Sequence, residues 1–325
     1  MADTDNNTQS WATDEQDMQV VRLEQDVRDT RPKRGPGRPP SKAPPPPLDR
    51  KGIVDSPKDP NNRLEFVYSD PMVFKSLFTY FKNIKARELH LRCTPKGLTF
   101  FARDHLKISR IVAHVAGEHV NWHYCESEYW LGINRDNVEK LFASIDKTFF
   151  KITMIQTHED PNSLIVIFKD AEIDKECNYR IVLSTYAKDF DLYEAETVLA
   201  GLTTTFPIEF ILTAKQFKKS ISDASNYSET VTFEKLGAYP LQLTYVKANM
   251  SYNEVYRNSE KIKLRSEIDD MTTFRCTIKI SNIKSLAASM VTDDVRILCR
   301  EEGDMLFRSA IDAKALVVNT LTRLA

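Results

Sequence analysis

The chain has 325 residues, of which 42% are hydrophobic and 28% charged, which suits about two domains with hydrophobic cores of their own. No segment approaches the ~18 consecutive apolar residues of a membrane-spanning helix, and the acidic N-terminus is unlike a secretory signal. Neither G-x-G-x-x-G nor G-x-x-x-x-G-K occurs, so the sequence argues against a dinucleotide-binding fold or a phosphate loop.

The cysteines add a second constraint. Cys93, Cys125, Cys177, Cys276 and Cys299 are odd in number and form no C-x-x-C motif. Disulfide frameworks and zinc sites use paired cysteines at characteristic spacings. We therefore expect reduced thiols in an intracellular protein.

The net charge of −1 averages three unlike segments. Residues 1–30 carry eight acidic and two basic residues, whereas residues 31–51 carry seven basic residues and one acidic residue. The remainder, 52–325, is nearly neutral. A basic segment beside an acidic leader indicates an electrostatic role for the tail, such as nucleic-acid binding or nuclear import.

The N-terminal tail is rich in proline. Ten of the fifteen prolines lie between Pro32 and Pro60, and few apolar residues accompany them. Such a segment cannot offset its ordering entropy, so we expect residues 1–62 to be disordered and locally polyproline II. Residues 18–27 would suit a fragment of helix.

Residues 32–42 look like an AT-hook, a Gly-Arg-Pro strip that lies extended in the narrow minor groove of A·T-rich DNA. The residues that carry this likeness are Arg34, Gly37, Arg38 and Pro39. Pro36 stands where the usual Arg-Gly-Arg-Pro core has its first arginine, so we expect a weak, salt-sensitive tether. A basic proline-rich linker or nuclear-import signal explains these residues equally well.

Beyond the tail, apolar periodicity predicts four helices and sixteen strands. The helices are expected over residues 70–85, 135–145, 214–226 and 281–290, each with one apolar face. Asp70 followed by Pro71 is typical of a helix start, and Ser281 would cap the fourth helix. The strands are expected over residues 64–69, 88–94, 97–103, 108–115, 129–134, 149–156, 163–169, 179–184, 206–212, 230–236, 241–247, 262–267, 273–280, 294–300, 305–310 and 316–321.

The predicted order repeats one unit four times: a strand, a helix and three strands. It predicts an α+β fold of two similar domains, each of two βαβββ units, with helices on one side of antiparallel sheets. We place the first domain at 63–186, an interdomain connector at 187–205 and the second domain at 206–325.

Basic side chains occupy the helix faces opposite the apolar ones. Singly, such residues are ordinary solvated lysines. If all four helices line one side of the molecule, that side becomes positive and would hold phosphates without reading bases. Lys215, Lys218 and Lys219 form the most compact group. The full candidate set is Lys75, Lys82, Lys85, Arg87, Arg135, Lys140, Lys215, Lys218, Lys219 and Lys284.

We expect no metal, cofactor or catalytic group. His119, His123 and Cys125 could suggest a metal site, but residues four apart in a strand lie roughly 13 Å from each other and cannot share one ion. No nucleophile–base arrangement stands out, and the acidic pairs Asp269-Asp270 and Asp293-Asp294 are placed at turns.

The body of the chain resembles the sliding clamps of the PCNA type, and most closely the clamp-like proteins of large DNA viruses of the African swine fever type. The likeness covers residues 64–325, is densest over 64–104 and 283–313, and extends to RGPGRPP and RKGI in the tail. It implies the DNA-clamp (processivity) fold and a head-to-tail homotrimeric ring around duplex DNA, with basic helices facing the hole.

The resemblance also implies two kinds of contact with partners. The strand over 178–184 would pair with the strand over 261–267 of the next subunit. Leu192 and Tyr193 in the connector would border an outer pocket for short peptides of polymerases, ligases and other replication or repair proteins.

We therefore expect a non-enzymatic sliding clamp, a DNA polymerase processivity factor that acts in the host nucleus or in a viral replication compartment in the cytoplasm. The alternative is a clamp-fold transcription or scaffold factor that binds DNA without encircling it, which the acidic leader and the AT-hook-like strip favour. A Mg²⁺-dependent nuclease is a third interpretation and would need clustered carboxylates on strand ends.

Overall fold

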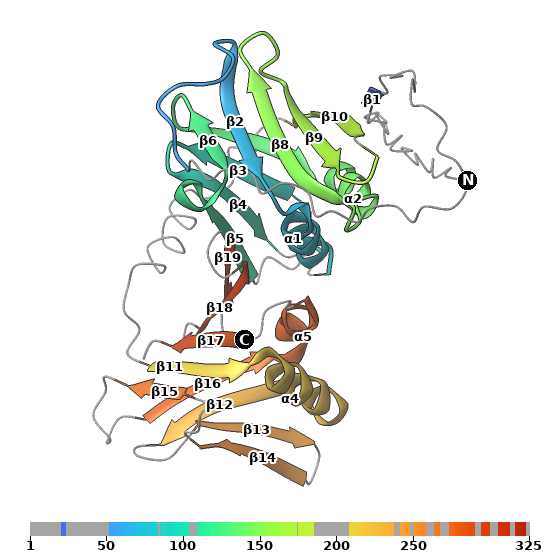
Figure 1. The fold of residues 1–325 in the computed structure, drawn as a ribbon. Helices are drawn as coiled ribbons and strands as arrows, with labels where there is room; N and C mark the ends of the chain where they lie inside the picture. Colours follow the sequence, from blue (N-terminus) through green and yellow to red (C-terminus); the bar gives the residue numbers. More distant parts are fainter. Residues whose placement is uncertain are drawn as a thin grey trace, which may run out of the picture.

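The structure is a computed structural model. It describes residues 21–23, 52–83, 85–86, 88–103, 109–173, 175–184, 208–236, 241–247, 250–257, 263–266, 273–289, 294–299, 305–312 and 316–322. In this part of the chain, two similar halves contain three antiparallel sheets and four α-helices (Figure 1).

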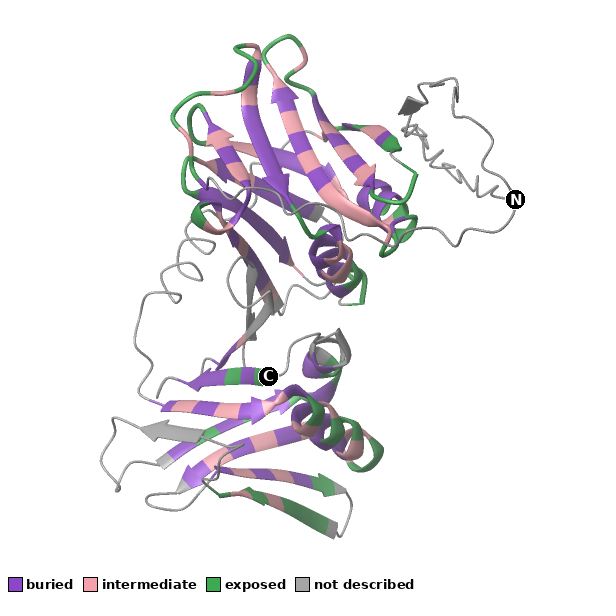
Figure 2. Ribbon diagram, in the orientation of Figure 1, coloured by how far each residue is buried: buried purple, intermediate pink, exposed green. Residues whose placement is uncertain are grey.

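A six-stranded sheet belongs to the first half. Its strands are β1 (Val21–Leu23), β2 (Asn62–Tyr68), β6 (Trp122–Cys125), β8 (Phe149–Thr157), β9 (Ser163–Asp170) and β10 (Glu176–Val182). They lie in the order β1-β10-β9-β8-β2-β6. Buried and more exposed residues alternate along β8 and β9, so the sheet turns one face to the core (Figure 2).

A nine-stranded sheet runs through both halves. The first half contributes β3 (Glu88–Thr94), β4 (Gly97–Arg103), β5 (Ser109–Ala116) and β7 (Tyr129–Asn134), and the second contributes β11 (Ile208–Thr213), β15 (Lys263–Ser266), β17 (Asp294–Cys299), β18 (Met305–Asp312) and β19 (Leu316–Thr322). The order is β15-β11-β17-β18-β19-β5-β4-β3-β7. The halves join where β19 pairs with β5, from Leu316 opposite Val115 to Thr322 opposite Ser109.

The third sheet has four strands and lies in the second half. Its members are β12 (Thr230–Leu236), β13 (Leu241–Lys247), β14 (Met250–Tyr256) and β16 (Thr273–Lys279). Their order is β14-β13-β12-β16, so β14 is an edge strand.

The helices are α1 (Pro71–Asn83), α2 (Arg135–Ala143), α4 (Ala214–Tyr227) and α5 (Ile280–Ser289), with a 3₁₀ turn at Gly117–His119. Their apolar faces pack into the core: the rings of Phe78 and Phe142 stack with centroids 4.5 Å apart, and those of Phe217 and Phe307 lie 5.7 Å apart. Burying each such side chain stabilises the fold by about 2–3 kcal/mol. Among the described residues, no helix is long and apolar enough to cross a membrane.

The two halves repeat one plan. The order β6-β2-β8-β9-β10 in the first half matches β15-β11-β17-β18-β19 in the second, and β7-β3-β4-β5 matches β16-β12-β13-β14. The predicted α+β fold with four βαβββ units is therefore confirmed. β6 and β15 lie outside these units: β6 follows the first unit, and β15, which was predicted over 262–267, follows the third. By this equivalence, β10 corresponds to β19 and β14 corresponds to β5.

Three strands were not predicted. The helix fragment expected over 18–27 is wrong for Val21–Leu23, because these residues pair with β10 as β1 and tertiary pairing overrides a weak local preference. In β6 the buried positions are His123 and Cys125, so the strand lacks the alternating apolar residues by which strands are predicted. In β14, consecutive residues 251–253 are all exposed, so the strand lacks alternation.

Residues 52–61 belong to the folded first half, although the sequence placed them in the disordered tail. The amide of Val54 donates to the carbonyl of His123 at 3.0 Å, and the amide of His123 donates to the carbonyl of Gly52 at 2.9 Å. The carboxylate of Glu65 accepts the amides of Lys58 and Asp59 at 2.9 and 3.0 Å. These hydrogen bonds hold the segment against β2 and β6.

Candidate nucleic-acid interface

The four helices form one continuous row. α2 packs against α1, α1 packs against α5 of the other half, and α5 packs against α4. Figure 1 shows α2, α1, α5 and α4 one after another along one side of the two halves. The predicted arrangement of helices on one side is therefore present in the described part of the chain.

This row carries positive charge although the whole chain is nearly neutral. The four helices contain eight basic and three acidic residues, a net charge of +5, against −1 for the chain. α1 and α5 contain no acidic residue, and α4 contains only Asp223. A row of this charge suits a polyanion that is held through its phosphates.

The two predicted cations within α1 have structural partners instead. Lys75 Nζ donates to the carbonyl of Ile145 at 2.5 Å and to that of Ala143 at 3.4 Å. Lys82 forms an ion pair with Glu139, which ties α1 to α2. Lys75 is half-buried, so its charge serves the contact between helices more than the surface.

Arg135 also contributes mainly to structure. It is half-buried, its Nη1 donates to the carbonyl of Ala86 at 2.8 Å, and it forms an ion pair with Asp136. The start of α2 is fixed by Asn134, whose side chain accepts the amides of Asp136 and Asn137. Arg135 therefore holds the segment that follows α1 and offers little free charge.

Lys85 occupies an unusual backbone position at the end of α1. Its φ is 55°, in the left-handed region that favours glycine. The amide of Lys85 donates to the carbonyl of Lys82 at 2.9 Å, and that of Ala86 donates to the carbonyl of Phe81 at 3.0 Å. These are the two bonds of a Schellman motif, with lysine where glycine is usual. The Lys85 side chain is exposed on the row.

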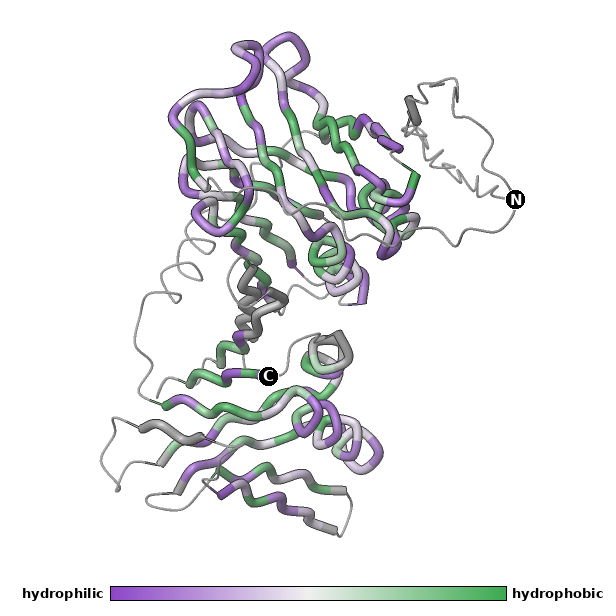
Figure 3. Tube along the Cα trace, viewed as in Figure 1, coloured by the Kyte–Doolittle hydropathy of each residue, from purple (hydrophilic) through white to green (hydrophobic). Residues whose placement is uncertain are grey.

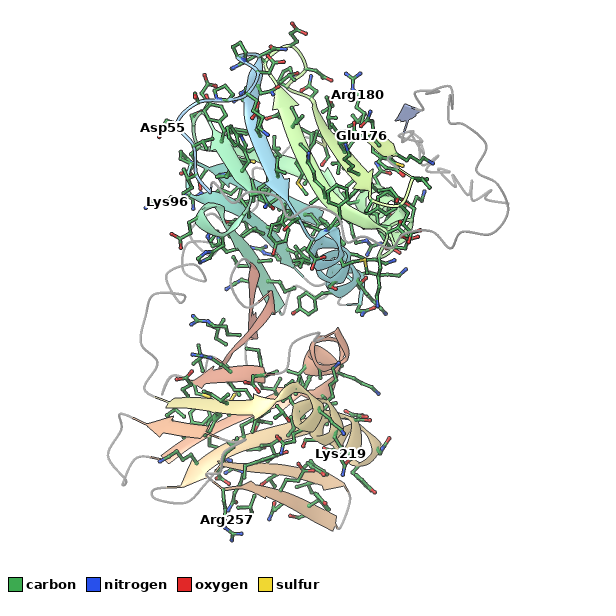
Figure 4. All side chains as sticks on the ribbon, viewed as in Figure 1. Asp55, Lys96, Glu176, Arg180, Lys219 and Arg257 are labelled. Carbon is green, nitrogen blue, oxygen red and sulfur yellow. The ribbon has the colours of Figure 1, made fainter. Side chains whose placement is uncertain are left out.

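α4 presents the most compact group of cations. Thr213 and Gln216 form a reciprocal capping box at its start. Phe217 and Ile221 are buried, which leaves Lys215 and Lys219 exposed and Lys218 half-buried on the opposite face. Figure 3 shows hydrophilic residues along α4, and Figure 4 labels Lys219 there.

α5 continues the row from α4. It begins at Ile280, so Ser281 lies in its first turn and is not the N-cap that the sequence predicted. Lys284 is exposed, and its Nζ donates to Ser225 Oγ of α4 at 3.3 Å. A neutral hydroxyl acceptor leaves the charge of Lys284 uncompensated.

The structure thus divides the candidate set. The exposed cations with no acidic partner among the described residues are Lys85, Lys140, Lys215, Lys219 and Lys284. Lys75, Lys82 and Arg135 have the partners given above, and Lys218 is half-buried. The remaining candidates lie outside the described residues: Arg87, the tail residues Arg34, Gly37, Arg38 and Pro39, and Leu192 and Tyr193 in the connector.

The residues considered for a metal site have other contacts. His123 is fully buried, and its Nε2 donates to the carbonyl of Thr94 at 2.7 Å. Burial lowers the pKa of His123. His119 lies beside Glu118, and Cys125 Sγ donates to the carbonyl of Ser127. Among the described residues, no three His, Cys, Asp or Glu side chains gather as a metal site.

Sequence reasoning missed a second feature, which is exposed apolar side chains at the β10 and β14 edges. Val182 on β10 is 41% exposed, and Val246, Tyr252 and Val255 on β13 and β14 are 44–56% exposed. The Tyr252 ring stacks on Tyr245, with centroids 4.9 Å apart. Apolar exposure at sheet edges is typical of protein–protein contacts. Recognising β14 as a strand would have revealed the patch.

The strand expected to meet a neighbouring subunit needs a correction. Residues 261–267 were to pair with the 178–184 strand of the next subunit. The described part, β15, instead pairs with β11 in its own half and holds the position equivalent to β6. The strand equivalent to β5, which forms the junction inside the chain, is β14.

Comparisons with known proteins agree with this architecture. The family model described as "Proliferating cell nuclear antigen, N-terminal domain" matches residues 63–192. Protein E301R of African swine fever virus, described as uncharacterized, is 46% identical over 303 residues in isolates from both Kenya and Namibia. The alignment covers 92% of this chain and 98% of the relative.

A solved structure shares the fold. The proliferating cellular nuclear antigen of Entamoeba histolytica superposes on 81% of this chain and 99% of its own, with a TM-score of 0.66 and 14% sequence identity.

Proposed function

Because the chain belongs to the PCNA-like family that includes protein E301R of African swine fever virus, we propose that it is a DNA sliding clamp. In this role a ring of subunits encircles duplex DNA and tethers a DNA polymerase. The clamp would act through topology and would catalyse no reaction.

The observation that carries the proposal is the junction inside the chain. There β19 of the second half pairs with β5 of the first half over seven residue pairs. The equivalent strands, β10 and β14, also have seven residues each. β14 is the end strand of its sheet, and only the three-residue β1 lies beyond β10. Pairing β10 with β14 of the next copy would repeat the internal junction head to tail.

Repetition of the junction would close a ring and extend the helix row around its inner wall. We take three copies, as the resemblance to clamps implies. The exposed apolar residues Val182 on β10 and Tyr252 and Val255 on β14 support the proposal, because they lie on the two strands that would pair.

The inner wall would hold DNA loosely. Lys85, Lys140, Lys215, Lys219 and Lys284 are long, solvated side chains that would contact phosphates and not bases. Each such contact releases counterions, so association would weaken steeply with salt. Weak contacts that are equivalent along the duplex allow a ring to slide.

Sedimentation at several concentrations tests the ring. We expect a species with three times the mass of the 37.4 kDa chain. Val255→Asp should abolish it, since a buried charge at the β10–β14 contact is costly. Ile53→Asp is the matched control, because both side chains are 44% exposed and Ile53 lies near β6. Equal assembly of the two variants would contradict the proposed interface.

Three further parts of the proposal come from sequence analysis, and the residues of the first two lie outside the described part of the chain. Leu192 and Tyr193 would border a pocket for short peptides of replication and repair proteins. The strip around Arg34, Gly37, Arg38 and Pro39 would tether DNA weakly. The protein would work in the host nucleus or in a cytoplasmic viral replication compartment.

One observation favours the alternative of a clamp-fold transcription or scaffold factor that does not encircle DNA. β1 occupies the outer edge of β10, and a ring would need that edge for pairing with the next subunit. A stable monomer that binds linear and circular DNA equally would support this second function.

A further inference from the structure

The outer edge of β10 is covered by the N-terminal tail of the same chain. Val21, Arg22 and Leu23 of β1 lie opposite Arg180, Tyr179 and Asn178 in antiparallel pairing (Figure 1). On its other side, β10 pairs with β9 along all seven of its residues. Both edges of β10 are therefore engaged within one chain.

A strand edge offers one row of backbone donors and acceptors and accepts one partner at a time. β1 takes residues 178–180, which are the middle three of the seven in β10. A second strand of seven residues cannot pair with this edge while β1 stays. The tail and a neighbouring copy would therefore need the same backbone groups.

We propose that β1 is a removable cap that competes with β14 of a second copy for the β10 edge, and so raises the protein concentration at which the ring assembles. The competition rests on the proposed function, because it requires a ring in which β10 pairs with β14 of the next subunit. The pairing of β1 with β10 within one chain does not depend on a ring. The cap would also shield the free protomer from uncontrolled pairing between edges.

The length of the chain allows the cap to come from the same molecule. The next described residue after Leu23 is Gly52, so 28 residues separate the two anchors. Gly52 contacts β6, at the opposite edge of the six-stranded sheet. Five strand spacings amount to about 24 Å, whereas 28 extended residues reach about 90 Å. A tethered segment of this kind acts at an effective concentration of order millimolar.

The size of the cap suits reversible competition. Three residue pairs are fewer than the seven that β14 would form, so the neighbouring copy has the larger pairing surface. If the cap covers about two-thirds to nine-tenths of free protomers, it weakens apparent assembly about threefold to tenfold.

Paired proline substitutions test the competition. Successive amides of a strand point to opposite sides, so Arg22→Pro with Leu23→Pro removes a donor toward β10 whatever the register. Arg22→Ala with Leu23→Ala is the matched control, because it removes the same side chains and keeps both donors. Assembly is followed by sedimentation of the full chain across a concentration series.

We expect the proline chain to assemble at a three- to tenfold lower concentration, and the alanine chain to stay closer to the parent. If the parent forms rings and the prolines change nothing, the inference is wrong and the proposed function stands. If parent and proline chains both stay monomeric at every concentration, both proposals are wrong.

A disulfide tests the pairing without reference to the ring. Val21→Cys with Arg180→Cys places two thiols directly opposite, within disulfide reach, whereas Val21→Cys with Val182→Cys places them diagonally, at about 7 Å. The native cysteines are all buried in the described structure. We expect fast oxidation of the first pair to a bridge within one chain. A bridge between chains, or equal oxidation of the two pairs, would overturn the inference.

Discussion

The ammonium group of Lys75 on α1 lies 2.5 Å from the carbonyl oxygen of Ile145, just beyond the end of α2. A second carbonyl, that of Ala143, lies 3.4 Å away. A cation at a helix C-terminus satisfies carbonyls that lack partners in the helix. This contact joins two helices of the row and removes one lysine from the set available to phosphates.

We expect Lys75→Met to lower the free energy of unfolding by about 1–2 kcal/mol, because a charged hydrogen-bond donor is lost. DNA affinity should change by less than about twofold. Lys219→Met is the matched variant: its stability should stay within about 0.5 kcal/mol of the parent, and its DNA affinity should fall. Denaturant unfolding and DNA titration measure both. A larger DNA effect at Lys75 than at Lys219 would contradict the division of the basic residues.

At Lys85 we expect protein stability and DNA binding to favour different residues. Lys85→Gly should stabilise the protein by about 1 kcal/mol, since φ is 55° and glycine tolerates this region. The same change should weaken DNA association by removing a cation. Lys85→Ala is the control, because it removes the charge without relieving the backbone. If glycine and alanine gave equal stability, the strain at this position would be disproved.

Glu65 anchors the segment before the first long strand. Its side chain is 3% exposed and accepts the amides of Lys58 and Asp59, Asn62 Nδ2 at 2.7 Å and Trp122 Nε1 at 2.9 Å. We expect Glu65→Gln to cost about 2–3 kcal/mol, because an amide group would face donors.

Residues 52–61 should then become the first site of proteolysis. Glu139→Gln, which touches a more exposed ion pair, should cost less than about 1 kcal/mol. Similar losses in the two variants would contradict the anchoring role of Glu65.

His123 predicts how stability depends on pH. Its Nε2–H donates to a carbonyl, and its buried Nδ1 has no hydrogen-bond partner, so protonation at Nδ1 is unfavourable. Burial lowers the pKa of His123 below 6.5, and it also lowers the pKa of His114. The unfolded chain therefore binds the proton first, and stability falls as the pH drops below about 6.5.

Denaturant unfolding between pH 5 and 8 should show this slope, and His123→Asn should make it shallower while the contribution of His114 remains. His158→Gln, at an exposed histidine, should leave the slope in place. If the slope were unchanged in the His123 variant, the pH dependence would come from other titratable groups, and the prediction would be wrong.

Local sequence signals predicted the parts of the fold that short-range chemistry decides. Asp70 and Pro71 mark the start of α1, and the Asp70 side chain indeed accepts the Met72 amide at 3.0 Å. Strands with one buried face were found because their residues alternate. β14 was missed, because an edge strand awaiting a partner exposes residues of both faces.

The candidate site was harder to predict. Periodicity shows on which face of a helix a lysine lies, but it does not show which residue the lysine contacts. Lys75 and Lys82 lie on the expected face, yet their partners come from α2 and its C-terminal turn. The left-handed conformation of Lys85 could not be predicted from the sequence, because lysine, unlike glycine, does not favour this conformation. Such contacts depend on how two helices meet, which only the tertiary structure sets.

Retention on circular DNA directly tests whether the protein encircles the duplex. The protein is assembled on nicked circular duplex, washed at high salt to remove charge-based binding, and the DNA is then cut once. A ring should survive the salt on the circle and leave rapidly after the cut, because it slides off the free ends. Equal retention before and after cutting, or complete loss in salt from the uncut circle, would contradict encirclement.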